Sequence, residues 1–429
     1  MTSEDSARRG PVLGKVVFVN RYFFPDESAT SRMLSDLAFR LARQGVPVAI
    51  VTSRQLYGDA RAALKPRESI QGVEVHRVAT ATRGRSRLAG RAMDYASFHI
   101  AAGWELLRLL SRGDVVVAKT DPPLISITVA RVAAWKGALL VNWLQDLFPE
   151  VASALTPGLI PKWFEGLLVA ARDRSLRAAA INVVLSNGMR HRLLSRKIED
   201  ARIRVVPNWA DVTNVTPLPT RDSRTRHKLG LGDRFVVGYS GNLGRAHEFE
   251  TLIGAARVLR EDDRFAFLIT GSGAKAESLQ SAVRAENLEK SFVFQDYQPP
   301  ELLSDSLAAA DVHLVSLLPA LEGLIVPSKI YGILAAGRPT VFIGDTAGDL
   351  ARMVLEHGCG IAVAAGESER LAAQLSELRN DPVRHESMGR SARRLALQRY
   401  TSERAVEDWI EFLNGIAPSV AHGAADLAL

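Results

Sequence analysis

The chain has 429 residues, of which 47% are apolar and 24% charged, and this favours a globular protein of two domains over a disordered or fibrous one. A formal net charge of +7 suggests an anionic partner, and the single cysteine, Cys359, excludes an internal disulfide and a thiolate metal cluster. Because residues 1–10 carry charges and no run of 18 apolar residues occurs, we expect a cytoplasmic protein without a signal peptide or membrane span.

Apolar runs and helical patterns alternate along the first half of the chain. Residues 16–20 form a continuous apolar run typical of a buried strand, a polar loop follows over 21–28, and helical spacing continues to Gly45 before a strand over 46–52. Further strands are predicted at 73–77, 115–119, 138–144, 181–185 and 203–206. This alternation predicts one doubly wound parallel sheet.

The pattern stops over 208–221, where prolines stand among polar residues, so this segment is the best candidate for a linker. The alternation then restarts, with strands predicted at 235–239, 265–270, 292–295, 312–317, 340–343 and 360–363 and final helices at 371–379, 384–399 and 402–413. We therefore expect an α/β protein of two doubly wound, Rossmann-like domains that face each other across a cleft, where ligands usually bind.

Basic and aromatic residues gather in parts of the first half. Four arginines without an acid among them fall close together, namely Arg83, Arg85, Arg87 and Arg91. A helical pattern with Trp104 follows, and the segment 161–168 places aromatic residues beside a lysine. This combination suits the surface of an anionic membrane, although a solvated loop and two core helices would explain it equally well. No nucleic-acid recognition module is visible.

The stretch over 322–337 predicts a loop between two buried strands and a helix that opens at Pro327 or Ser328. Ser328 can bond the free amides of that helix. The loop would deliver Glu322, Ser328 and Lys329 to the carboxyl end of a parallel sheet, where a helix start stabilises an anion. This predicts a phosphate site, with an ordinary strand-loop-helix as the alternative.

A glycine-rich loop, Gly241-Asn242-Leu243-Gly244-Arg245, follows the strand over 235–239. Its glycines let the backbone approach a ligand, the next helix start would present free amides, and Arg245 can make a bidentate contact to phosphate. The loop lacks the Gly-Lys-Ser/Thr ending of a nucleotide-hydrolase loop. The alternative is a glycine turn without a ligand.

A second loop, Gly271-Ser272-Gly273, follows the next strand and opens a helix, which fits the loose dinucleotide fingerprint with Asp296 in the place of the ribose-binding acid. That fingerprint belongs in the first β-α unit of a domain, and here it stands in the second. We interpret the loop as a wall of a nucleotide site and keep NAD binding as a minor alternative.

In the first half, Asp146 follows a buried strand and could orient an acceptor hydroxyl or stabilise developing positive charge, unless it only caps a turn. The first loop of the same sheet, with Arg21, Asp26 and Ser28, could line the acceptor side of the cleft. No histidine pair at metal-ligand spacing and no Asp-x-Asp occurs, so metal dependence is not expected.

Six short motifs stand in a fixed order: NRYFFP (20–25), WLQDLFPE (143–150), VPNWAD (206–211), GYSGNLG (238–244), PSKIY (327–331) and AAGRP (335–339). Together they resemble glycosyltransferase family 4, most closely the branch with colanic acid and O-antigen sugar transferases of bacteria, over about residues 15–415. The resemblance implies a GT-B fold, a nucleotide-diphosphate sugar donor of UDP or GDP type, no metal or other cofactor, and retention of anomeric configuration.

The resemblance also implies roles and boundaries. The loop over 241–244 and Arg245 would face the donor diphosphate, Lys329 would neutralise it, and Glu322 would touch the donor sugar as the first acid of a Glu-x7-Glu signature. The second acid is missing, because Ile330 or Gly332 stands in its place. We expect tails at 1–14 and 416–429, an acceptor domain at 15–212, a donor domain at 213–398 and a helix at 399–415 that packs back on the first domain.

These features predict an enzyme that transfers a sugar to a hydroxyl of a lipid-linked glycan in cell-surface polysaccharide biosynthesis, at the inner face of the cell membrane. A nucleotide-sugar epimerase, a non-catalytic sugar-nucleotide binder and an NAD oxidoreductase remain alternatives. Analysis of the product separates the first two: a new glycoside or an isomerised nucleotide sugar.

Overall fold

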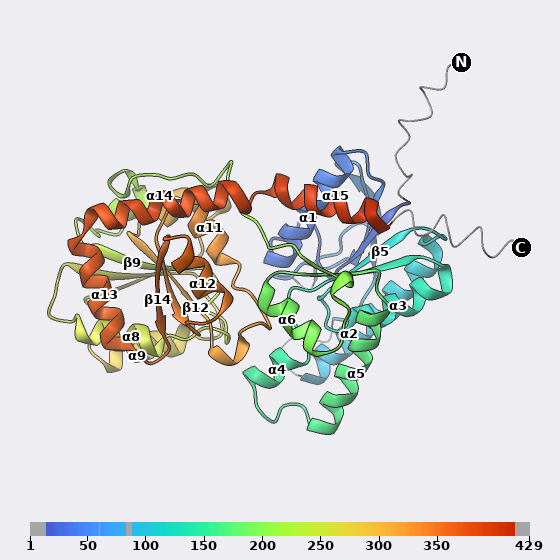
Figure 1. Cartoon of the computed structure of the whole chain (residues 1–429), viewed down its shortest axis with the longest axis horizontal. Coiled ribbons are helices and arrows are strands. Elements are labelled where there is room, and N and C mark those ends of the chain that lie inside the picture. The colour runs from blue at the N-terminus through green and yellow to red at the C-terminus, as the bar shows by residue number, and fades with distance from the viewer. Residues whose placement is uncertain (1–13, 60, 83–87, 417–429) are drawn as a thin grey trace, which may run out of the picture. The chain divides into compact units, whose positions relative to one another are not determined.

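The computed structural model describes residues 14–59, 61–82 and 88–416 (Figure 1). The chain divides into two compact units. The first unit comprises the chain up to Pro207 together with the residues from Glu403 onward, and the second is Asn208–Ser402. The predicted tails, apart from Gly14 and Ile416, and Arg83, Arg85 and Arg87 lie outside the described residues.

An eight-stranded sheet forms the centre of the first unit, in the order β3-β4-β2-β1-β5-β6-β7-β8. All neighbours pair in parallel except β3 and β4, which pair antiparallel. The strands are β1 (Val16–Val19), β2 (Val48–Ser53), β3 (Arg67–Ile70), β4 (Val73–Val78), β5 (Val115–Lys119), β6 (Leu139–Trp143), β7 (Ile181–Val184) and β8 (Ile203–Val205). The predicted doubly wound sheet is confirmed, and β3 is an additional edge strand.

Helices cover both faces of this sheet. They are α1 (Ala29–Arg43), α2 (Leu88–Leu109), α3 (Ile125–Lys136), α4 (Glu150–Leu155), α5 (Lys162–Ala178), α6 (Asn187–Ser195) and the short η1 (Asp200–Arg202). Helices α2 and α3 pack on alternate strand residues such as Val17 and Val116. Phe18 points the other way, as expected for a strand whose successive side chains face opposite sides.

The last helix, α15 (Ser402–Ile416), returns to the first unit. Its Trp409 ring lies 5.0 Å from Trp143 and 5.7 Å from Phe18, measured between centroids. These three aromatic side chains are fully buried or nearly so. Aromatic contacts of this kind stabilise beyond the area that they bury, so α15 is an integral part of this unit.

The second unit contains a six-stranded, wholly parallel sheet in the order β11-β10-β9-β12-β13-β14. Its strands are β9 (Phe235–Ser240), β10 (Phe265–Thr270), β11 (Phe292–Gln295), β12 (Val312–Ser316), β13 (Thr340–Gly344) and β14 (Gly360–Ala364). Every strand predicted for this half is present to within a residue or so. Long apolar runs explain this success, because both faces of a parallel sheet are buried.

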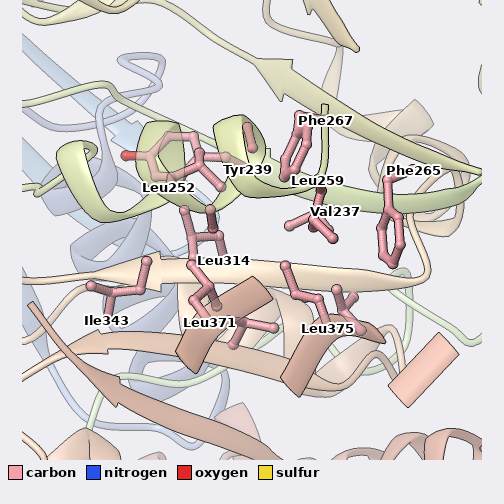
Figure 2. Close-up of a cluster of buried hydrophobic side chains, with 14 of the residues drawn as sticks. Val237, Tyr239, Leu252, Leu259, Phe265, Phe267, Leu314, Ile343, Leu371 and Leu375 are labelled. Atoms are coloured by element: carbon pink, nitrogen blue, oxygen red, sulfur yellow. The ribbon is translucent and has the colours of Figure 1, made fainter. Parts of the chain in front are cut away.

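The helices of the second unit are η2 (Thr220–Asp222), α7 (Arg224–Lys228), α8 (Glu250–Val258), α9 (Ala276–Ala285), η3 (Pro300–Leu302), α10 (Leu303–Ala308), η4 (Pro319–Leu321), α11 (Lys329–Ala335), α12 (Asp349–Glu356), α13 (Ser368–Asn380) and α14 (Pro382–Arg399). Figure 2 shows how α8 and α13 side chains such as Leu252 and Leu371 pack over Tyr239 and Leu314 of the sheet. The opposite face carries Val236, which packs with Leu231 and Ala309. The core therefore fixes both faces of the sheet whose strand ends carry the candidate site.

The segment indicated as a linker, 208–221, packs on the second unit. Arg393 Nη1 donates to Val215 O (2.8 Å) and Nη2 donates to Val212 O (3.0 Å). The boundary at 207/208 therefore precedes this segment. In the part of the chain that the structure describes, no helix is long and apolar enough to cross a lipid bilayer.

Candidate functional site

Two glycine-rich loops lie against each other where β9 and β10 end. Leu243 N donates to Ser272 O (2.9 Å), which joins the loop over 241–244 to the loop over 271–273. Gly271 (φ +129°) and Gly273 (φ +152°) adopt backbone angles that favour glycine, and a Cβ atom on either would clash with the loop over 241–244. The packing of the two loops is therefore sufficient to explain why glycine stands at these two positions. For this reason their match to the dinucleotide fingerprint does not support NAD binding.

Lys329, the first residue of α11, extends its amine toward the loop over 241–244. Its Nζ lies 3.5 Å from the Tyr239 ring centroid and 3.4 Å from His247 Nε2, and its Cε is beside Gly241. Burial lowers the pKa of Lys329 well below its usual value, and no carboxylate among the described residues opposes this effect. The residue as a whole keeps some exposure, so an anionic ligand could reach the amine and offset the cost of burying it.

His247 fixes the position of Lys329. The His247 Nδ1 atom lies 2.6 Å from Ser316 O, to which it donates, and Nε2 is left to accept from Lys329. Burial, with the nearby Lys329 charge, lowers the pKa of His247 to about 4, so the ring is neutral at physiological pH. Lys275 Nζ donates to the His247 carbonyl oxygen (2.9 Å). Sequence reasoning did not single out His247, although a histidine inside a glycine loop was a visible signal.

At the start of the helix after the first glycine loop, one amide already has a side-chain partner, whereas the sequence predicted free amides there. Helix α8 begins at Glu250, and Glu248 Oε1 accepts from Thr251 N (2.7 Å). A carboxylate therefore already caps the first turn. The Glu248 side chain is buried, and its Oε2 atom has no partner among the described atoms.

Ser328 is the N-cap residue of α11, but its side chain makes no capping hydrogen bond, so the predicted capping role is wrong. The helix begins at Lys329, one or two residues after the predicted start at Pro327 or Ser328. Arg245 and Asn242 are exposed on the first glycine loop, whereas Leu243 is buried. The Arg245 guanidinium has no hydrogen bond or ion pair to the residues that the structure describes, so it is available to a ligand.

Glu322 lies at the amino terminus of α12 in the same unit. Its Oε1 accepts from Asp349 N (2.8 Å), and its carboxylate lies against Gly348. Burial raises the pKa of Glu322, while the hydrogen bond from Asp349 opposes the rise. The expected contact with a donor sugar stays a prediction. Ile330 is fully buried within α11, and Gly332 follows on the same helix, so neither position offers a polar group to a ribose.

Asp146 follows β6 in the first unit and lines a small cavity of about 20 Å³ together with Lys119, Thr120, Ser126 and Arg172. A cavity of this size can hold one water molecule. Asp146 Oδ1 is buried without a hydrogen-bond partner. Burial raises the pKa of Asp146 to about 6, although a hydrogen bond from Thr120 acts in the opposite direction. A buried carboxylate oxygen without a hydrogen-bond partner is costly, and carboxylates with a raised pKa concentrate at functional sites.

Arg172, from α5, holds the segment that follows Asp146. Its Nη1 donates to Phe148 O (3.2 Å) and to Glu150, and its Nη2 donates to Asp173 Oδ1 (2.8 Å). The Arg172 guanidinium is buried, so this network is rigid. No local signal in the sequence indicated it, because Arg172 and Glu150 stand 22 positions apart.

The three acceptor-side residues all have partners in the loop after β1. Asp26 Oδ1 accepts from Ser28 N (2.9 Å) and from the Ser28 hydroxyl, and the other carboxylate oxygen accepts from Tyr57 N. Arg21 is buried with its guanidinium carbon 5.3 Å from the Tyr22 ring centroid, and its Nη2 lies 3.8 Å from Asp94 Oδ2. These contacts shape the loop, and a role toward an acceptor stays a prediction.

Among residues 14–59, 61–82 and 88–416, no group of three or more His, Cys, Asp or Glu side chains is arranged to hold a metal ion. The side chains that gather beside Gly241 are instead a lysine and a neutral histidine. The site is therefore cationic when Lys329 is protonated.

Two family models match the chain, one on each half. The glycosyl transferase 4-like domain matches residues 28–209, and glycosyl transferases group 1 matches residues 234–381. A probable glycosyltransferase, WbjE, of Pseudomonas aeruginosa is 27% identical over 62% of this chain and 66% of its own length, slightly under two thirds. A putative colanic acid biosynthesis glycosyl transferase, WcaI, of Escherichia coli K12 is 23% identical over 85% of this chain and 91% of its own length.

Among solved structures, HepE of Anabaena, crystallised in complex with UDP, superposes with a TM-score of 0.69 at 16% sequence identity. The superposition covers 94% of this chain and 100% of the HepE chain. At this identity the likeness shows the fold alone. One glycosyltransferase family model matches each Rossmann-like unit, and curated glycosyltransferases align across both units. The chain therefore belongs to the glycosyltransferases of GT-B fold and resembles the colanic acid and O-antigen transferases.

Proposed function

We propose that this enzyme is a retaining, metal-independent glycosyltransferase that moves a sugar from a UDP- or GDP-type donor to a hydroxyl of a lipid-linked glycan. Support for the nucleotide-sugar donor comes from HepE, which was solved with UDP. Support for a glycan acceptor comes from WcaI, which is named for colanic acid biosynthesis. A nucleotide-sugar epimerase is the alternative function. Product analysis distinguishes the two, because an epimerase forms no glycoside.

The observation that carries the proposal is the Lys329 amine beside Gly241. It is buried without a carboxylate partner among the described residues and lies at the carboxyl end of β9, next to a loop that carries the exposed Arg245. A diphosphate supplies the negative charge that this environment lacks, and the carboxyl ends of parallel strands are where open α/β sheets bind ligands. Two cationic side chains can take the charge-neutralising role that a divalent cation plays elsewhere, which supports metal independence.

In the proposed reaction, the bond between the anomeric carbon and the diphosphate oxygen breaks, and its electron pair leaves with the diphosphate. The acceptor oxygen forms the new bond on the same face of the sugar, and its proton passes to the departing diphosphate. Lys329 and Arg245 stabilise the developing negative charge. Asp146 orients the acceptor hydroxyl through its unpartnered oxygen, and Glu322 is the candidate contact for the donor sugar.

The test is product analysis. The purified enzyme is incubated with a panel of UDP- and GDP-sugars and a lipid extract containing polyprenyl-linked glycans, in EDTA and separately in magnesium. A new glycolipid with the donor's anomeric configuration, formed equally in EDTA, is the expected product. An inverted linkage, a strict requirement for magnesium, or an isomerised nucleotide sugar without a glycoside would each contradict the proposal.

We also propose peripheral attachment at the inner face of the cell membrane. The start of α5 exposes Trp163 (72%), Leu167 (58%) and Phe164 (42%) beside Lys162. Aromatic and aliphatic side chains next to a lysine suit the boundary between lipid headgroups and chains. Trp163→Ser combined with Leu167→Ser should abolish co-sedimentation with anionic vesicles. The control Val383→Ser, at an exposed site on α14, should not, and equal binding by both variants would contradict this attachment.

A further inference from the structure

A groove of about 390 Å³ lies in the first unit between the sheet edge formed by β3 and β4 and the helix α2. Its volume falls within the range of about 300 to 1,000 Å³ typical of small-molecule sites. The side chains that give it chemical character are Arg67, His76, Trp104, Glu105 and Arg108. None of them belongs to the glycine loops or to Lys329, which are in the other unit.

A hydrogen-bond network fixes the polar wall of this groove. Glu105 Oε1 accepts from Arg67 Nη2 (3.1 Å) and lies 2.9 Å from His76 Nδ1. Glu105 Oε2 lies 3.9 Å from Arg108 Nη1. Glu105 and His76 side chains are only 12% and 14% exposed, so the network is built into the fold rather than formed on the open surface.

The groove carries excess positive charge. Arg67 and Arg108 share the single carboxylate of Glu105, and their side chains are 67% and 60% exposed. The nearby Arg77 is already paired with Glu68 and donates to Phe24 O (2.7 Å). Two exposed guanidinium groups with one carboxylate between them leave donors that can bind an anionic group of a ligand.

Trp104 supplies an apolar wall beside this charge. Its side chain is 59% exposed, and the Arg108 guanidinium carbon lies 5.0 Å from its ring centroid. This cation–π contact holds the two side chains in place. A pyranose ring has one face made largely of C–H bonds, which packs on an indole ring, while its polar groups reach neighbouring charged side chains.

We propose that this groove binds an acidic saccharide unit, a pyranose that carries a carboxylate or phosphate group, as part of a glycan. Trp104 would pack on the ring, and Arg67 and Arg108 would bind the anionic group. Glu105, which His76 contacts, would hold the two arginines in place. The choice of a glycan as ligand rests on the proposed function. The groove would bind acidic glycans in preference to neutral ones. It lies in the first unit and shares no residue with the proposed donor site.

The test measures saccharide binding to the intact enzyme by saturation-transfer NMR and tryptophan fluorescence. The probes are a glucuronate-containing tetrasaccharide, a neutral tetrasaccharide of glucose, and inorganic phosphate. We expect the acidic tetrasaccharide to bind at least about tenfold more tightly than the neutral one. Trp104→Ala and Arg108→Gln should each weaken it at least about tenfold. Trp135→Ala, at an exposed tryptophan of α3 outside the groove, is the matched control and should leave binding unchanged.

Three results would overturn the inference: equal affinity for the acidic and neutral tetrasaccharides, loss of binding in the Trp135→Ala control, or no binding to the wild-type enzyme. Phosphate that binds as tightly as the acidic tetrasaccharide would also do so, since it would show a simple anion site. Lys329→Ala separates this inference from the proposed function. It should weaken nucleotide binding at least about tenfold and leave saccharide binding intact, and failure of nucleotide binding in the wild type would contradict only the proposed function.

Discussion

Lys329 Nζ and His247 Nε2 lie 3.4 Å apart, and the other ring nitrogen of His247 is fixed by Ser316 O at 2.6 Å. The histidine therefore positions the lysine amine, and in the proposed function it would act on the diphosphate only through that amine. This pair joins two segments that stand 82 positions apart in the chain.

Replacement of His247 should weaken diphosphate binding without unfolding the second unit. His247→Ala removes the acceptor of Lys329, and the loss of one hydrogen bond to a charged group costs about 1.5 to 3 kcal/mol, or roughly 10- to 150-fold in affinity. His247→Gln keeps an acceptor and should recover part of the affinity. Calorimetric titration with UDP and GDP checks this, and circular dichroism controls for folding. Equal affinity in wild type and His247→Ala would show that the histidine only fills space.

Diphosphate binding should draw a proton to Lys329. Burial lowers the pKa of this amine, and a bound anion favours its charged form, so the complex holds more protons than the free enzyme. Affinity should consequently fall as pH rises, and this fall should come at lower pH than the titration of an ordinary lysine amine. The binding enthalpy should depend on the ionisation enthalpy of the buffer in the wild type and not in Lys329→Ala. A buffer-independent enthalpy in the wild type would contradict this coupling.

Asp146→Asn should raise stability at neutral pH while it lowers turnover. Burial raises the pKa of Asp146 to about 6 from its ordinary value of 3.8, so the folded state binds more protons than the unfolded state between these pH values. Stability therefore falls as pH rises through this window, by about 3 kcal/mol in total. The variant should be the more stable protein at pH 7.5 by up to that amount, and the difference should vanish near pH 4. Denaturant unfolding at several pH values measures it, and an Asn variant with wild-type turnover would remove the catalytic role.

Gly271→Ala should destabilise the enzyme more than Gly366→Ala. Both glycines have positive φ angles, +129° and +93°, but a Cβ on Gly271 would clash with Gly241 O, whereas nothing lies within 4 Å of one on Gly366. Backbone strain is common to both variants, so the difference isolates the packing of the two glycine loops. We expect it to be about 1 to 3 kcal/mol in unfolding free energy. Equal destabilisation would mean that the loops separate readily.

The sequence predicted both sheets well because their strands are continuous apolar runs. It missed β3, whose residues Arg67–Ile70 alternate between exposed and half-buried positions and so lack such a run. An antiparallel edge strand has one open side, and its composition is close to that of a loop. The return of α15 to the first unit was expected from the resemblance.

The candidate site was predicted only in its local parts. Lys329 and the loop over 241–244 come together as expected, because strand-loop-helix units place their loops at one edge of a sheet. His247 and Arg172 act through partners far away in the sequence, which a motif cannot reveal. For Glu322 the motif implied a contact with a ligand, and that contact stays a prediction. The motif did not indicate the partner that the fold gives its carboxylate, a backbone amide at the start of a helix.

The most direct test of the central claim is calorimetric titration of UDP, GDP and NAD into the wild type, Lys329→Ala, Arg245→Ala and the control Arg257→Ala. Arg257 is an exposed arginine of α8 that pairs with Glu286 away from the glycine loops. We predict that one nucleoside diphosphate binds the wild type and the control equally, in EDTA as in magnesium. Each of the other two variants should lose about 1.5 to 3 kcal/mol of binding free energy for that diphosphate. Unchanged binding in Lys329→Ala, or binding of NAD alone, would contradict the account.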